Sequence, residues 1–247
     1  MSINPELSIV IPAKNESRHL PSLLSSLAKQ DYPAMAGTEV FVADAGSTDG
    51  TAAIARSYDN LLNIRVIEGG LPSVGRNRGA AQSTSRYVLF LDADVELRDR
   101  TLLRRAVAAM QKQRLHCQTV DIACAEGTWA DRLLYWGNSR MQRLSAWGMP
   151  FGTGMFLLFE RSRFHELGGF AEDAVFAEDF LLTKQVSPLR FSVLDGCIYT
   201  SNRRFRRTGH ARMVFLFFWT LLNCRNRSHF VRDHGYWDGA TETVSKA

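Results

Sequence analysis

The sequence has little cysteine and no apolar run long enough to cross a membrane. Its 247 residues hold four cysteines, none in a C-x-x-C pair, and their spacing matches no zinc motif. We therefore expect reduced thiols rather than a disulfide framework. The longest apolar run near the end, 213–222, is far shorter than the ~20 residues that a span requires. The first residues predict no secretory leader.

The composition excludes a disordered chain. Hydrophobic residues make up 45% and charged residues 22%, which is ordinary for a globular protein. The length allows one large α/β domain, and we find no repeats or low-complexity linker. The net charge of +5 and pI of about 9.2 predict a polyanionic partner: nucleic acid, an anionic membrane face or a phosphorylated substrate.

Strand and helix patterns alternate through the first half of the chain. Apolar runs at 7–11, 39–43, 64–67 and 87–91 predict strands, with helical patterns between them. Near-continuous apolar strands separated by helices indicate a parallel sheet that is covered on both faces. The predicted fold class is α/β and Rossmann-like, with a mostly parallel central sheet flanked by helices. Ligands bind such sheets beyond the carboxyl ends of the strands.

The second half continues with a less regular pattern. We expect helices at 101–113, 129–147, 161–167, 177–186 and 213–223, and strands at 117–125, 154–159, 190–194 and 197–200. The helical segment 129–147 carries three tryptophans.

Two acids, Asp92 and Asp94, follow the fourth predicted strand directly, with Ala93 between them. Two neighbouring carboxylates repel each other and are costly to desolvate. A hard divalent cation, Mn²⁺ or Mg²⁺, offsets both costs. The alternative is a solvated turn with helix-capping acids. The position beside other polar clusters favours the metal.

Polar residues also follow the first two strands and open the third helix. Asp44 is placed to accept a hydrogen bond from a base N–H, and Glu16 one from a ribose hydroxyl. Arg76 and Arg78 can pair with a diphosphate or with Asp92. For each arginine taken singly, a solvated position at the basic start of a helix explains the sequence as well as phosphate pairing does.

Asp179 follows Glu178 at the start of a predicted helix. The helix dipole stabilises a carboxylate there, which predicts an ionised acid able to take a proton from a hydroxyl. Plain helix capping is the alternative.

A cluster of five arginines near the end needs a counter-charge, for which substrate phosphates would serve. Its members are Arg203, Arg204, Arg206, Arg207 and Arg212. The aromatic run 213–219 follows at once. A basic cluster beside an aromatic helix too short to span is typical of an interfacial anchor. A core helix with an exposed arginine collar is the alternative, and aromatic helices are more often core.

Taken in order, these segments resemble family 2 glycosyltransferases. The resemblance covers 7 to about 207. It lies in 8–16 (SIVIPAKNE), 42–51 (VADAGSTDGT), 75–79 (GRNRG), 89–94 (LFLDAD), 152–154 (GTG), 164–170 (FHELGGF) and 177–179 (AED).

The resemblance implies the GT-A fold and a metal-dependent, inverting transfer from a nucleotide-diphosphate sugar to a hydroxyl acceptor. We expect a UDP-sugar donor, and hypothesise a lipid-linked acceptor shaped by 129–147 and 203–222. Asp179 is the implied general base. The nucleotide-sugar-binding residues are Pro12, Ala13, Glu16, Asp44, Arg76, Asp92, Ala93, Asp94, Arg203 and Arg204, and Asp92 and Asp94 are also the metal ligands.

The predicted organisation is a GT-A domain over 1–207, with a nucleotide-binding half at about 1–98 and an acceptor half at about 99–207. An aromatic helix and tail follow at 208–247. We expect a cytoplasmic protein, and peripheral binding to the inner face of the cell membrane is a hypothesis.

Two departures from the family pattern matter. Ala45 stands where many members have a second acid after the second strand, which leaves the base contact open. The segment 202–205 (NRRF) lacks the Gln and Trp of the Gln-x-x-Arg-Trp motif, which argues against a polymer-extruding synthase.

Other functions remain as alternatives. A non-catalytic nucleotide-sugar or membrane-binding module is one, although the retained acids speak against it. A sugar nucleotidyltransferase would need a Gly-rich phosphate loop after the first strand, and Pro12 to Glu16 is not Gly-rich. A nucleic-acid partner is disfavoured because the acids after the fourth strand would repel a duplex.

Overall fold

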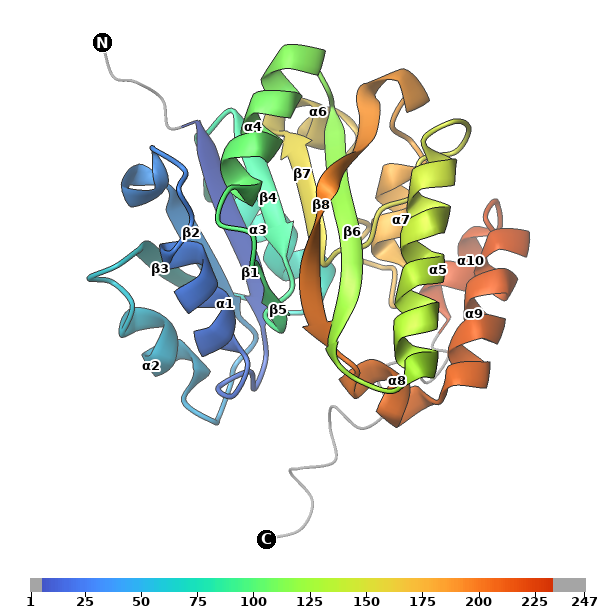
Figure 1. Cartoon of the computed structure of the whole chain (residues 1–247), viewed down its shortest axis with the longest axis horizontal. Helices are drawn as coiled ribbons and strands as arrows, with labels where there is room; N and C mark the ends of the chain where they lie inside the picture. Colours follow the sequence, from blue (N-terminus) through green and yellow to red (C-terminus); the bar gives the residue numbers. More distant parts are fainter. Residues whose placement is uncertain (1–5, 233–247) are drawn as a thin grey trace, which may run out of the picture.

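One eight-stranded mixed sheet with helices on both faces forms the centre of the computed structural model, which describes residues 6–232 (Figure 1). The strand order is β3-β2-β1-β4-β7-β6-β8-β5. The strands are β1 (Leu7–Ala13), β2 (Glu39–Asp44), β3 (Asn63–Glu68), β4 (Tyr87–Leu91), β5 (Val95–Glu96), β6 (Cys117–Glu126), β7 (Phe156–Glu160) and β8 (Phe191–Ser201). Neighbours run parallel from β3 to β4 and between β6 and β8, whereas β7 is antiparallel to β4 and β6, and β5 to β8. The predicted fold class is confirmed.

The helices connect these strands and cover the sheet. They are α1 (Leu20–Ala28), α2 (Thr51–Arg56), α3 (Pro72–Gln82), α4 (Leu102–Gln113), α5 (Trp129–Ser145), α6 (Arg161–Glu166), α7 (Glu178–Thr183), α8 (Arg203–Thr208), α9 (His210–Leu222) and α10 (Arg227–Val231). Within the described range, no helix has both the length and the apolar character needed to cross a membrane. All four cysteines are free thiols.

Several predicted elements differ from the structure. The strands expected at 190–194 and 197–200 form the single strand β8, whose register against β6 shifts at Val120 and Asp121. The first helix begins at Leu20, after a turn in which Asn15 has a left-handed φ of 54°. β5, α8 and α10 were not predicted.

The strand register brings the sequence-predicted polar residues to one edge of the sheet. Ala13 pairs with Asp44 across β1 and β2, and Val10 pairs with Phe90 across β1 and β4. Asp92 therefore follows β4 at about the level where β1 and β2 end. β4 is buried throughout, so its backbone is fixed by core packing on both faces.

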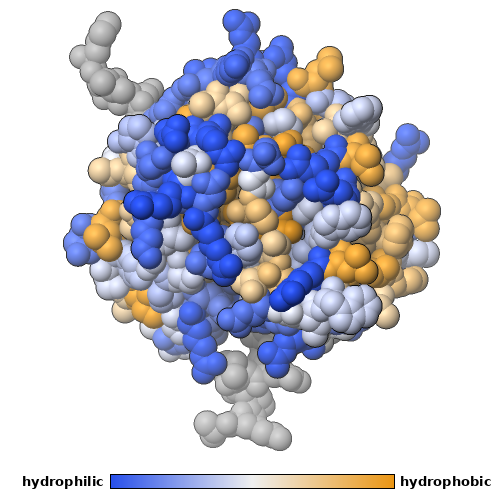
Figure 2. Space-filling model, in the orientation of Figure 1, coloured by the Kyte–Doolittle hydropathy of each residue, from blue (hydrophilic) through white to orange (hydrophobic). Residues whose placement is uncertain are grey.

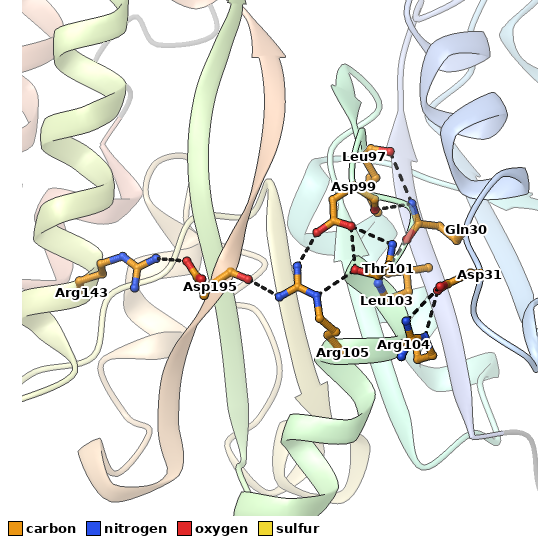
Figure 3. A network of polar contacts seen from close by, with 10 residues as sticks. All are labelled: Gln30, Asp31, Leu97, Asp99, Thr101, Leu103, Arg104, Arg105, Arg143 and Asp195. Atoms are coloured by element: carbon orange, nitrogen blue, oxygen red, sulfur yellow. Dashed lines mark hydrogen bonds and ion pairs between the residues drawn. The ribbon is translucent and has the colours of Figure 1, made fainter.

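A polar network fixes the chain that leaves this edge (Figure 3). The side-chain amide of Gln30 donates to the carbonyl of Asp99 at 3.0 Å and accepts from the N–H of Leu103 at 3.2 Å. Arg105 binds the Asp99 carboxylate and donates to the carbonyl of Asp195 at 2.5 Å. The segment after Asp94 is thus held between α1 and β8.

Close packing of α3 on β1 depends on Gly79. A Cβ at Gly79 would lie 2.4 Å from Cγ1 of Val10, whereas a Cβ at Gly137 in α5 would meet nothing within 4 Å. We expect Gly79→Ala to lower the free energy of unfolding by about 1–3 kcal/mol. Gly137→Ala is the matched control and should raise it by about 0.5–1 kcal/mol, because alanine favours the helix. Urea unfolding measures both, and equal effects would contradict the packing argument.

Candidate active site

Asp44, at the end of β2, has one carboxylate oxygen that accepts no hydrogen bond from the described residues. Its Oδ2 accepts from the N–H of Ser47 at 3.2 Å, while its Oδ1 is buried and has no hydrogen-bond partner among the described residues. A buried carboxylate oxygen without a partner is costly. A donor N–H from a bound ligand, such as a nucleobase, would satisfy it. Pro12 and Ala13 end the neighbouring strand, beside this position.

Arg203, near the end of the chain, binds two of the predicted acids, Glu16 and Asp94, which lie in its first half. Its guanidinium donates to the Glu16 carboxylate at 2.8 and 3.1 Å, and to Oδ2 of Asp94 at 3.2 Å. The Ser201 hydroxyl also reaches Asp94, at 3.4 Å. Burial raises the pKa of Glu16, although Arg203 opposes that shift. A cation thus already lies between carboxylates that would otherwise repel.

Arg76 joins the acids of a second cluster, on the α3 side. It is 3% exposed and donates to Asp92 at 2.6 Å and to Glu178 at 2.7 Å. Its guanidinium also lies 5.1 Å from the ring centroid of Phe170. A Cβ at Gly154 would approach within 2.5 Å of this guanidinium, so glycine is required there. Arg76 therefore links the end of β4 to the start of α7.

Asp179 sits beside this cluster with its carboxylate held by two backbone N–H groups. Gly154 and Phe180 each donate to it at 2.8 Å. Some of its surface reaches solvent, but the surrounding protein raises its pKa to about 6, chiefly by burial and then by the charge of Glu178. The preceding Ala177 has a left-handed φ of 51°, a strained state for a residue other than glycine. The site thus holds a carboxyl group whose pKa is raised above its ordinary value by burial.

The donor set suits a metal ion shared with a substrate, rather than one caged by protein. Residues 6–232 contain no group of three or more His, Cys, Asp or Glu side chains arranged to hold a metal. Asp92 and Asp94 supply carboxylate oxygens at one strand end. Mg²⁺ commonly takes one or two carboxylates together with substrate phosphates, so these two residues fit such an ion.

The structure brings most of the predicted site residues together. Ala93 is buried between the two acids, and the side chain of Arg204 lies outside the described residues. Arg78 faces away from the acids after β4 and pairs with Glu68 at 2.9 Å. The sequence interpretation missed Gly154 as a donor to Asp179 and Glu178 as a partner of Arg76, although both lie in the quoted motifs.

The three tryptophans of 129–147, Trp129, Trp136 and Trp147, are all exposed to solvent. The expectation that this segment shapes the acceptor site stays a prediction. The polar face of α5 is the one that packs on the protein.

The sequence is similar to a known protein family and to several named relatives. The family model described as glycosyl transferase family 2 matches residues 8–168. Poly(ribitol-phosphate) beta-N-acetylglucosaminyltransferase TarS of Staphylococcus aureus strain Mu50 is 38% identical over 101 residues, which are 39% of this chain and 18% of the relative. The 4,4'-diaponeurosporenoate glycosyltransferase of Staphylococcus haemolyticus is 34% identical over 113 residues, 44% of this chain and 29% of the relative.

Solved structures agree with the fold. TarS 1–349 of S. aureus in complex with UDP-GlcNAc has a TM-score of 0.63 and 27% identity, covering 80% of this chain and 59% of that one. The mannosyltransferase PcManGT of Pyrobaculum calidifontis, with GDP-Man and Mn²⁺, has a TM-score of 0.66 at 22% identity and covers 85% of this chain and 63% of that one, a likeness of fold alone. The chain belongs to glycosyl transferase family 2 and has the GT-A fold. It spans less than a third of the curated relatives' length.

Proposed function

We propose that the chain transfers a sugar from a UDP-sugar to a hydroxyl acceptor with inversion at the anomeric carbon. The observation that carries the proposal is Asp179, a carboxyl group with a pKa raised to about 6 beside the Arg76–Asp92 pair. A base with a pKa near the working pH is well matched to deprotonating a hydroxyl. The UDP complexes of TarS support the choice of nucleotide.

Each cluster then has a task in the proposed reaction. Asp44 accepts from the base through its unpartnered oxygen, and Glu16 accepts from the ribose. Asp179 takes the proton from the acceptor hydroxyl as that oxygen attacks the anomeric carbon, and the bond to the diphosphate breaks. Arg76 holds Asp92 in place, and Arg203 contributes positive charge near the leaving diphosphate. No covalent sugar–protein bond is required.

Asp92 and Asp94 are the proposed ligands of a Mn²⁺ or Mg²⁺ ion. When bound, such an ion neutralises the charge that develops on the leaving diphosphate.

Calorimetric titration with UDP, GDP and TDP, with and without Mn²⁺, tests the donor site. We expect UDP to bind most tightly, and Asp94→Asn to weaken the Mn²⁺-dependent binding by about tenfold or more, since loss of even an outer partner of a metal ligand typically costs about 10–100-fold in metal affinity. Glu96→Gln, a half-buried acid on β5 that pairs with Arg98, is the control and should bind like the wild type. A folded wild-type protein that binds no nucleotide would contradict the proposal and favour a non-catalytic module.

The finer proposal is that the acceptor is linked to a lipid. Its support is physical: α8, which carries Arg203, leads directly into the aromatic helix α9. An acceptor held at a lipid surface beside α9 would lie near the donor site.

A further inference from the structure

Helix α5 is amphipathic in the reverse of the usual sense. A surface helix normally turns its apolar stripe toward the core. Here the buried residues are Asp131, Tyr135, Ser139 and Gln142. The exposed large residues, spaced as one helical face, are Trp129, Leu133, Trp136, Leu144 and, just past the end, Trp147. The helix is therefore built to place its apolar face outward.

Helix α9 also exposes large apolar side chains. Its exposed face carries Phe215, Phe218, Trp219 and Leu222 at helical spacing. Phe215 and Trp219 stack with ring centroids 5.9 Å apart, so they form a flat aromatic surface. Only Leu216 and Thr220 of this helix are buried.

The two apolar faces belong to one surface. α9 runs alongside α5 in the same direction, because Nε2 of His210 lies 2.7 Å from Oδ1 of Asp131 near both N-termini. Farther along, the rings of Phe217 and Phe151 are 5.8 Å apart. Figure 1 shows the two helices next to each other, and Figure 2 shows hydrophobic residues at the side where α9 lies, with hydrophilic and pale residues interleaved over α5. We call the outward faces of α5 and α9 the α5–α9 surface.

The segments that carry this surface are rich in arginine. The segments 129–149 and 206–225 contain seven arginines and a single acid, Asp131. That acid is 1% exposed and is held by His210, Asn202 and Thr128. The exposed Arg140 has its guanidinium 5.9 Å from the ring centroid of Trp136. Cations are thus interleaved with the aromatic side chains, although Arg140 and Arg143 are paired with Asp121 of β6.

We propose that the α5–α9 surface docks on an anionic lipid surface, with both helices lying in the plane of the interface. Tryptophan and arginine are the side chains that favour the boundary between headgroups and acyl chains. Four of the five tryptophans of the chain, at 129, 136, 147 and 219, lie on this surface. Basic side chains add attraction to anionic headgroups. The docking does not depend on the proposed sugar transfer.

Sedimentation with vesicles of phosphatidylcholine, with and without phosphatidylglycerol, tests the docking on the full chain. We expect binding to the phosphatidylglycerol vesicles at low salt, weaker binding as salt rises, and a shift of tryptophan emission to shorter wavelength. The double variant Trp136→Ser/Phe218→Ser should bind about tenfold or more weakly, because two large apolar contacts are lost.

The matched control is Leu61→Ser/Leu189→Ser, which removes two exposed apolar side chains elsewhere and should bind like the wild type. Both double variants should titrate with UDP like the wild type, which separates this test from that of the donor site. A wild type that stays in solution at low salt would overturn the docking, as would equal binding of the Trp136→Ser/Phe218→Ser variant. A dimer that this variant dissociates, without vesicle binding, would assign the surface to a second copy and also overturn it.

Discussion

Asp179→Asn should lower kcat by about 10²–10⁴-fold, the usual contribution of a positioned general base, while UDP binds as it does to the wild type. The substitution keeps the shape of the side chain and one of its two oxygens, which accept separately from the N–H groups of Gly154 (Oδ2) and Phe180 (Oδ1). It removes the negative charge that would take the acceptor's proton. The loss of kcat is measured by following the release of UDP during sugar transfer to a hydroxyl acceptor. Asp173→Asn, an exposed acid of the preceding loop, is the control and should leave kcat unchanged.

The same substitution should change the dependence on pH. Because the pKa of Asp179 is about 6, the wild-type rate should rise with pH through that value as the carboxyl ionises. The residual rate of Asp179→Asn should lack this rise. An unchanged acid limb in Asp179→Asn would assign the titration to another group and contradict the role given to Asp179.

Stability provides an independent check on this carboxyl group. A folded-state pKa above the ordinary value favours the native state when the acid is protonated. This contribution is full below a pH of about 4 and is lost as pH rises through about 6. The free energy of unfolding should therefore fall less between pH 4 and pH 7 in Asp179→Asn than in the wild type.

The first half of the fold was predictable because its signals are local. Each strand from β1 to β4 is an apolar run ended by polar or turn residues, and the parallel sheet follows from the alternation with helices. β5 is only two residues long and exists through its pairing with β8, at Thr200 and Tyr199. The hydrophobic periodicity of one segment does not indicate a partner strand more than a hundred residues away.

The outward orientation of the apolar face of α5 could not be predicted from the sequence for a related reason. A helical pattern shows which residues share a face, but not whether that face meets protein or solvent. Asp131 decides the orientation, because its buried contacts to His210 and Asn202 come from the far end of the chain.

Residue types at the strand ends placed Asp44, Asp92 and Asp94 at one edge of the sheet in advance, because the carboxyl ends of the strands meet there, and their roles stay predictions. Pairings between distant segments were beyond reach. Arg203 binds Glu16 across 187 positions, and nothing near either residue indicates the other. Likewise, the partner of Arg76 on α7 was unforeseen, although Glu178 adjoins the predicted base.

Arg76→Met should lower the free energy of unfolding by about 3–5 kcal/mol, because it leaves Asp92 and Glu178 without their buried counter-charge. Arg78→Met is a matched control on the same helix. Its partner Glu68 is largely exposed, and a surface pair contributes only about 0–1 kcal/mol. Urea unfolding of both variants measures the difference, and similar losses would show that the Arg76 pairings contribute no more than a surface contact.

Removing either of two charges near Asp179 should shift the rise of kcat with pH, and the two removals should shift it in opposite directions. Arg76 lowers the pKa of Asp179 and Glu178 raises it, each through its charge. Arg76→Met should therefore shift the rise of kcat to higher pH, and Glu178→Gln should shift it to lower pH. Glu178→Gln keeps the Arg76–Asp92 pair, so it tests the coupling even if Arg76→Met does not fold. A protein in which Glu178→Gln leaves the acid limb in place would show that Glu178 does not set the pKa of Asp179. Opposite shifts would show that Arg76 and Glu178 tune the base through their charges.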